Sequence, residues 1–228
     1  MTGWWAHDVF NSMGGGGAGA TAVLGWAFWV LASITLHELG HGWAAIWEGD
    51  LTPIESGHMS ASPLVHMGGF SLIVFALIGI AWGLMPVNPS RFRHHRWGRV
   101  IVAAAGPAMN LLLFIVTATL LGVLLGTEAL KPDDTGFGAN MIRFLLMGAT
   151  LNLVLLAFNL LPVPPLDGWR ILEGLSFKIR MLTNHPNAPI AGLFFLMVVF
   201  LTGAFDWMFA ASNHVALWWV SGAANLVS

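Results

Sequence analysis

The chain has 228 residues, of which 57% are hydrophobic and 9% are charged, and its mean hydropathy is +0.75. This composition is typical of an integral membrane protein and excludes an ordinary soluble domain. The formal net charge of −2 gives no basic surface for a nucleic-acid partner. Because the sequence has no cysteine, any metal ion has to be bound by histidine and carboxylate groups.

The N-terminal part predicts a segment at the membrane surface followed by a long membrane helix. Residues 1–19 hold two tryptophans and a run of four glycines, which favours an interfacial segment and a joint. Residues 20–47 form an apolar run that is long enough to cross a bilayer. Tryptophans near its ends suit the boundary between lipid and water.

The motif H-E-x-x-H lies inside this first membrane helix, as His37, Glu38 and His41. Residues four apart share a helix face, so both imidazoles can reach one metal ion, and Glu38 can act as general base on a bound water. The alternative is a pair of structural core histidines. That alternative weakens in a membrane helix, because ionisable groups there are costly and usually functional.

The segment after this helix has a mixed pattern. Residues 48–65 are polar and rich in turn-forming residues, and they are compatible with short β-strands. Residues 66–86 form a second apolar run, which four glycines interrupt. Residues 87–99 carry four arginines, which we interpret as a determinant of membrane topology, with binding of lipid headgroups or substrate as the alternative.

Two further membrane helices are expected at about residues 100–125 and 141–161, followed by C-terminal helices within residues 173–228. The predicted fold class is therefore an all-α polytopic membrane protein with four to six transmembrane helices. We expect one domain over residues 1–228, with its catalytic core at residues 20–172.

A catalytic zinc site normally has three protein ligands and keeps one position for water, so the motif needs a third ligand. Asp167 follows a helix end that three prolines break. Unwound backbone at membrane depth is tolerated only where it is buried in protein or lines a cavity, so a carboxylate there suits a metal site. An ordinary turn at Asp167 is the alternative, and spacing alone does not separate the two.

Several stretches resemble the site-2 protease family of intramembrane zinc metalloproteases, and two of them resemble its compact bacterial members in particular. Two features depart from the usual family pattern: the PDZ and CBS domains are absent, and only 19 residues precede the motif helix where the family usually has a span. The matching stretches are H-E-L-G-H at 37–41, S-P-L-V-H at 62–66, P-V-N-P at 86–89, A-A-A-G-P-A-M-N at 103–110 and N-L-L-P-V-P-P-L-D-G-W-R-I-L at 159–172.

The resemblance implies one Zn²⁺ ion, three zinc ligands, a catalytic base and residues that line the path of the substrate. The implied zinc ligands are His37, His41 and Asp167. The implied base is Glu38. The positions that match the substrate path are Asn159 and Pro162.

The two halves of this site have to meet at one depth in the membrane. His41 lies about seven residues before the end of its helix, which is roughly 10 Å below that surface. Asp167 can reach it only if one of the two apolar runs between them, 66–86 or 100–125, does not cross the membrane. The glycines in 66–86 favour this run as a re-entrant segment packed against protein. In that arrangement, His66 and Asn110 are candidates to lie beside the metal ligands.

This topology also orients the chain. Seven of the nine lysine and arginine residues fall on one side, which the positive-inside rule assigns to the cytosol. We expect an integral protein of a bacterial cell membrane with its active site nearer the cytosolic face. The expected activity is zinc-dependent hydrolysis of peptide bonds within or near transmembrane segments of membrane-anchored substrates. The expected partners are a transmembrane protein substrate and the lipid bilayer.

Two other functions remain open from the residues alone. One is a metal-binding membrane transporter that uses the same three ligands, and the other is an inactive membrane scaffold. Glu38 discriminates between them and a protease, because a transport site does not need a base beside its ligands.

Overall fold

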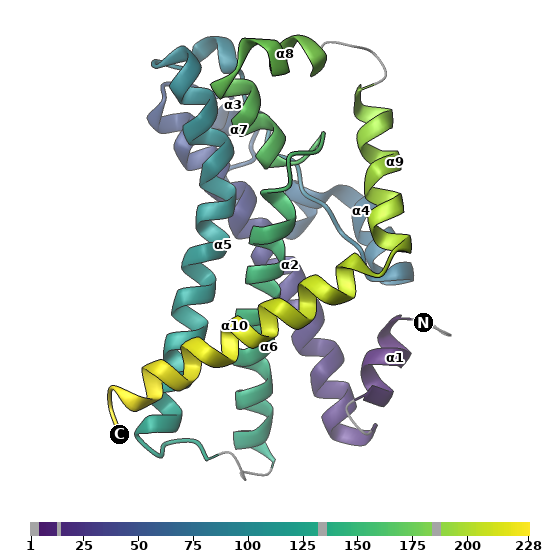
Figure 1. Cartoon of the computed structure of the whole chain (residues 1–228), viewed down its shortest axis with the longest axis vertical. Coiled ribbons are helices and arrows are strands. Elements are labelled where there is room, and N and C mark those ends of the chain that lie inside the picture. The colour runs from purple at the N-terminus through teal and green to yellow at the C-terminus, as the bar shows by residue number, and fades with distance from the viewer. Residues whose placement is uncertain (1–4, 13–14, 132–135, 184–187) are drawn as a thin grey trace.

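Three long helices form the frame of the protein (Figure 1), namely α2 (Gly16–Trp47), α5 (His95–Gly126) and α6 (Phe137–Asn159). The computed structural model describes residues 5–12, 15–131, 136–183 and 188–228, and these are helical or irregular throughout. In this described part, the same three helices are the ones that are long and apolar enough to cross a membrane. The prediction of an all-α polytopic membrane protein is confirmed.

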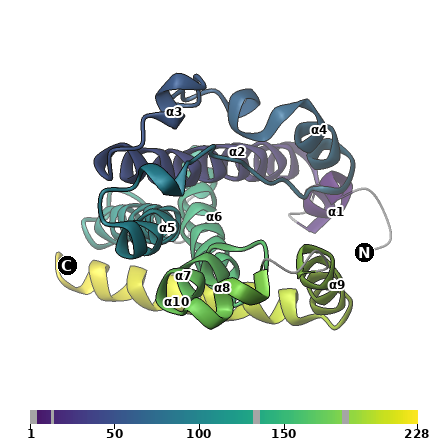
Figure 2. The same cartoon turned by 90° about the horizontal axis from the view of Figure 1, so that it is seen from above.

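The shorter elements lie around this frame. They are α1 (Trp5–Ser12), α3 (Thr52–Glu55), α4 (Pro63–Ile78), the 3-10 turn η1 (Pro89–Arg91), α7 (Asp167–Leu175), α8 (Phe177–Thr183), α9 (Ala188–Leu201) and α10 (Ala204–Asn225). Seen from above, α3 and α4 cover one face of α2, while α5 and α6 lie on its other face with α10 beyond them (Figure 2).

Small residues let the three long helices approach closely. A Cβ atom on Gly40 of α2 would lie 2.8 Å from the carbonyl oxygen of Ala105 in α5. The ring of Trp29 in α2 rests on Gly148 of α6, and its Nε1 donates a hydrogen bond of 2.8 Å to the carbonyl of Phe144. In lipid there is no hydrophobic driving force between helices, so the van der Waals packing that this close approach permits holds them together.

In the described residues, three helices meet the length and apolarity of a span, compared with the four to six spans that the sequence indicated, and the C-terminal region is interrupted. Gly203 takes a left-handed conformation (φ 73°) between α9 and α10. With 14 residues, α9 is about 21 Å long, which is shorter than the hydrocarbon core of a bilayer. Asp206, Asn213 and His214 make α10 less apolar than a span. Instead, α10 packs across α5 and α6, where Ala216 and Val220 join the core.

The apolar run at 66–86 turns back on itself, as the re-entrant prediction requires. It begins in α4, which is kinked at Gly68 (φ 67°, ψ 164°) and ends at Gly79. The chain then returns without helical structure, so that the Leu84 amide donates to the carbonyl of His66 at 2.9 Å. The hydroxyl of Ser71 also bonds both backbone groups of Trp82.

Residues 48–65 contain no β-strand, so the short strands that we considered there are wrong. Their polar groups are satisfied locally instead of in a ladder between strands. Asp50 accepts hydrogen bonds from the amide (3.0 Å) and hydroxyl (2.5 Å) of Thr52, which begins the single turn of α3. Turns then lead from Ser56 to α4.

The path of the chain brings the ends of α2 and α6 together. α2 ends where α3, α7 and α8 lie, α5 runs away from this end, and α6 returns to it (Figure 1). The antiparallel pair α5 and α6 therefore returns the chain to the end of the motif helix, where α7 begins with Asp167.

Candidate metal centre

His37, His41 and Asp167 converge, although 126 positions of sequence separate the last two. The Nε2 atoms of the two histidines are 3.1 Å apart, and Oδ2 of Asp167 lies 3.0 Å from His37 Nε2 and 3.3 Å from His41 Nε2. All three side chains are buried. In a tetrahedral zinc site with bonds of about 2.0–2.1 Å, ligand atoms are roughly 3.3 Å apart, so the triangle fits one ion. In the described chain, no other cluster of such side chains could hold a metal.

The second nitrogen of each imidazole has a fixed hydrogen-bond partner. His41 Nδ1 lies 2.7 Å from the carbonyl oxygen of Val102, and His37 Nδ1 lies 2.7 Å from Oδ1 of Asn110. A carbonyl oxygen only accepts, so Nδ1 of His41 carries a proton. Both partners come from α5, which lies against the motif face of α2.

A chain of buried amides fixes the proton on His37 in the same way. Asn152 Nδ2 donates to the carbonyl of Gly148 (2.9 Å), and Asn110 Nδ2 donates to Oδ1 of Asn152 (3.0 Å). Because the Gly148 carbonyl can only accept, the orientation of both amides follows. Oδ1 of Asn110 therefore faces His37 and accepts from its Nδ1. Nothing in the sequence analysis singled out Asn152.

In the neutral imidazole form that binds a metal ion, a proton on Nδ1 leaves the Nε2 lone pair bare. In that form, His37 and His41 present these lone pairs to each other and to Oδ2 of Asp167, so the three converging atoms are acceptors. That buried oxygen has no hydrogen-bond partner. Lone pairs that converge at about 3 Å without a proton between them repel one another, and a cation at their centre removes this repulsion. The three ligand atoms, and the hydrogen bonds that hold the Nδ1 atoms of the two histidines, fit a Zn²⁺ ion.

Two glycines leave room for the centre. A Cβ atom on Gly106 of α5 would lie 2.6 Å from His37 Nε2, so α5 forms the floor under the ligands. A Cβ atom on Gly83 would lie 2.6 Å from Oε1 of Glu38, so the returning chain passes directly over this carboxylate. Glu38 is thereby buried next to the two histidines and shielded from bulk water.

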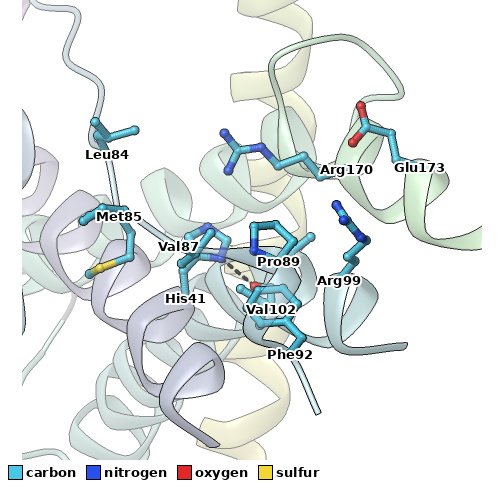
Figure 3. A pocket seen from close by; sticks show the side chains of 12 residues that line it. His41, Leu84, Met85, Val87, Pro89, Phe92, Arg99, Val102, Arg170 and Glu173 are labelled. Atoms are coloured by element: carbon cyan, nitrogen blue, oxygen red, sulfur yellow. Dashed lines mark hydrogen bonds between the residues drawn. The ribbon is translucent and has the colours of Figure 1, made fainter. Parts of the chain in front are cut away.

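A cavity of about 350 Å³ opens beside His41 toward the end of the molecule that carries α7 and α8. The sequence gives no local sign of this cavity, because its walls come from four separate parts of the chain (Figure 3). The lining consists of His41, Leu84, Met85, Pro86, Val87, Pro89, Phe92, Arg99, Val102, Ala103, Arg170 and Glu173.

Two buried carboxylates hold one wall of this cavity in place. Oδ2 of Asp50 accepts a hydrogen bond of 2.5 Å from the Asn88 amide. Glu48 accepts bonds from the His94 amide and from His94 Nδ1, both at 3.0 Å. Burial raises the pKa of Glu48, but these hydrogen bonds outweigh it, so the pKa of the carboxyl is lower than usual. The loop between Pro86 and His94 is therefore fastened to the end of α2.

The other residues singled out from the sequence lie at different distances from the centre. Asn110 contacts His37 directly. His66 is buried in α4, with Nε2 donating to the carbonyl of Ser60 (2.6 Å) and Nδ1 unpaired, and it does not belong to the metal-binding group. Asn159 bonds the carbonyl of Leu155 within α6, and Pro162 is exposed. Neither lines the cavity, so their contact with substrate stays a prediction.

Comparison with known proteins agrees with this geometry. A family model described as "Peptidase family M50" matches residues 25–202. "Putative zinc metalloprotease YwhC" of Bacillus subtilis (strain 168) is 38% identical over 176 residues, which cover 76% of this chain and 78% of that protein. "Putative zinc metalloprotease Rip2" of Mycobacterium tuberculosis (strain H37Rv) is 29% identical over 215 residues, which cover 90% of this chain and 76% of that protein.

No solved structure gives a significant match to the chain. The family match nevertheless spans most of the chain, including the helix with H-E-x-x-H and the segment with Asp167. Together with three apolar helices that can cross a bilayer, it accounts for a group of metal-binding side chains buried within a membrane protein. The chain belongs to peptidase family M50, the site-2 protease family, and is an integral membrane zinc metalloprotease.

Proposed function

We propose that the protein hydrolyses peptide bonds within or next to the transmembrane segments of membrane-anchored proteins. One zinc ion bound by His37, His41 and Asp167 would serve this reaction. The observation that supports this most is the convergence of three buried acceptor atoms below the end of a membrane helix. His41 lies six residues before Trp47, the last residue of α2, which is about 9 Å along the helix axis. A bond cleaved there lies inside the membrane boundary.

Each side chain around the centre has a distinct part in this proposal. Zinc, when bound, polarises the scissile carbonyl and acidifies a water molecule. Glu38 accepts a proton from the attacking water and delivers it to the nitrogen of the leaving amine. Asn110 and the Val102 carbonyl hold the two imidazoles so that Nε2 faces the centre. Gly83 lets the chain cover Glu38, which keeps this proton transfer away from bulk water.

The substrate has to present an extended backbone, because the peptide bonds of a helix are shielded by their own hydrogen bonds. The space beside His41 is bounded by the non-helical chain around Met85 and by α7. Asn159 and Pro162, at the end of α6, are proposed to contact the substrate on its way to this space. Beyond its kink at Gly68, helix α4 offers four large exposed apolar side chains to lipid or to an arriving segment: Phe70, Ile73, Leu77 and Ile78.

We further propose that the end with α3, α7 and α8 faces the cytosol of a bacterial cell. Seven of the nine lysine and arginine residues lie in elements at this end, whereas Lys131 and Arg143 flank the opposite turn. The whole chain then acts as one domain, with residues 20–172 as its catalytic core. The packing of α10 on α5 and α6 supports this arrangement.

The direct test compares the wild type with Glu38→Gln in lipid bilayers that contain a single-span substrate. We expect both proteins to carry one zinc ion, and the variant to lose cleavage by roughly 10²–10⁴-fold, the usual contribution of general acid–base catalysis. Cleavage by Glu38→Gln at the wild-type rate would remove Glu38 as the base. A wild type that transports Zn²⁺ across sealed vesicles but cleaves no substrate would support the transporter instead.

A further inference from the structure

The cavity beside His41 has an uneven distribution of charge. Its walls are largely apolar, but Arg99 near the start of α5 and Arg170 in α7 also line it (Figure 3). Neither guanidinium has an ion pair or a side-chain hydrogen bond within the described chain. Other arginines at this end do have partners: Arg91 bonds Glu55 at 2.7 Å, and Arg96 bonds the carbonyl of Gly174 at 2.9 Å.

One acidic side chain, Glu173, lines the same cavity. It forms no ion pair of 4.0 Å or less with Arg99 or Arg170. Arg99, Arg170 and Glu173 together carry a formal charge of +1 on the lining. Because the remaining walls are apolar, they screen this charge less than water would, which strengthens the attraction for an anionic group.

We propose that this cavity is a subsite for an acidic side chain of the substrate, on the cytosolic side of the scissile bond, with Arg99 and Arg170 binding its carboxylate. The proposal rests on the proposed function, since it assumes that a polypeptide is cleaved at the metal centre. Planar guanidinium groups bind carboxylates through paired, charge-assisted hydrogen bonds. The cavity extends from His41 toward the end of the molecule assigned to the cytosol, so the acidic side chain lies on the cytosolic side of the scissile bond.

The position of His41 favours a substrate over a resident lipid as the occupant. His41 lines the cavity and is at the same time a proposed zinc ligand, so a group bound there lies next to the reacting bond. A lipid phosphate held by the same arginines would block the space that an extended substrate has to enter. A side chain of the substrate itself occupies the space and leaves with the product.

The test uses a set of single-span substrates in which Asp, Asn or Lys replaces each residue in turn on the cytosolic side of the cleaved bond. At one position, we expect the wild type to prefer Asp over Lys by roughly 10–100-fold in kcat/KM, as for a lost hydrogen bond to a charged group. Arg99→Glu and Arg170→Glu should each reverse this preference, while Arg99→Gln and Arg170→Gln should only abolish it. Lys178→Glu is the matched control, because Lys178 is an exposed cation at the same end of the molecule and does not line the cavity.

A second measurement separates this inference from the proposed function. The affinity of Glu38→Gln protein for the Asp and Lys substrates is measured without turnover, and the zinc content of every variant is determined. Tighter binding of the Asp form supports the subsite. Equal affinity for both forms overturns it, whether or not the wild type cleaves them. A preference that is present in phosphatidylcholine bilayers and lost in phosphatidylglycerol bilayers would assign the cavity to lipid phosphate and also overturn it.

Discussion

Replacing Gly106 by alanine would perturb the candidate metal centre without changing any ligand. The new Cβ atom would lie 2.6 Å from His37 Nε2 and 2.6 Å from Cε1 of His41. Carbon and nitrogen atoms in ordinary contact are about 3.5 Å apart, so both rings would have to move by at least about 0.9 Å, and His41 by more, because its Nε2 is nearer still to the new Cβ atom. The hydrogen bonds from each Nδ1, both 2.7 Å long, oppose that movement.

The expected magnitude follows from the tolerance of zinc coordination. Ligand distances in zinc sites vary by only about 0.2 Å, so a displacement of this size disrupts the triangle. Loss of a single supporting partner typically lowers metal affinity 10–100-fold, and displacing two ligands should cost at least about 100-fold. We therefore expect Gly106→Ala to lose zinc in a competition titration against a chelator, and to lose proteolysis with it.

The matched control is Gly122→Ala on the same helix. Its Cβ atom would lie 2.5 Å from Cβ of Ala223 and 2.6 Å from the carbonyl oxygen of Val220, a clash of similar size in the contact between α5 and α10. Gly122 is 16 residues from Gly106, about 24 Å along α5. This variant should lower thermal stability but bind one zinc ion per folded molecule. Wild-type zinc affinity in Gly106→Ala would refute the proposed location of the metal.

Three further variants test other parts of the account. Asn152→Leu removes the amide that orients Asn110, so zinc affinity should fall roughly 10–100-fold while helix content is kept; unchanged affinity would mean that the amide chain does not hold His37. Gly83→Ala forces the chain away from Glu38, so kcat for a single-span substrate should fall with zinc content unchanged, and Gly69→Ala, where a Cβ meets nothing within 4 Å, should leave kcat as it is. Glu48→Gln should lower the melting temperature at pH 7. Since the pKa of Glu48 is lowered on folding, its contribution is present above its ordinary pKa of 4.5 and is lost as the pH falls below that value, so the two melting temperatures should converge in acid. A constant difference across the pH range would contradict this.

The sequence predicted the elements whose physical signals are local. Apolar runs of sufficient length gave α2, α5 and α6, and helical spacing placed His37 and His41 on one face. The turn at residues 66–86 followed from a non-local requirement, namely that Asp167 reach the motif helix. The hydrogen bond between Leu84 and His66 shows that the chain does return.

The missed features depend on contacts between distant segments. Asn152 is a lone polar residue in an apolar helix, and its partner Asn110 is 42 positions away. Since unpaired polar groups are costly in lipid, the presence of one such amide in each of two spans was the available signal. The cavity with Arg99 and Arg170 had no local signal, because it forms only where α2, α5, α7 and the returning chain meet.

The identity of the metal ligands is tested most directly by X-ray absorption at the zinc edge of the purified protein. The account predicts one zinc ion per chain, with two imidazole nitrogens at about 2.0–2.1 Å and oxygen ligands at about 2.0–2.2 Å. Asp167→Ala should alter the oxygen shell, and His37→Ala should remove one imidazole. Spectra of both variants that match the wild type, with full zinc content, would contradict the assignment of His37, His41 and Asp167 as the zinc ligands.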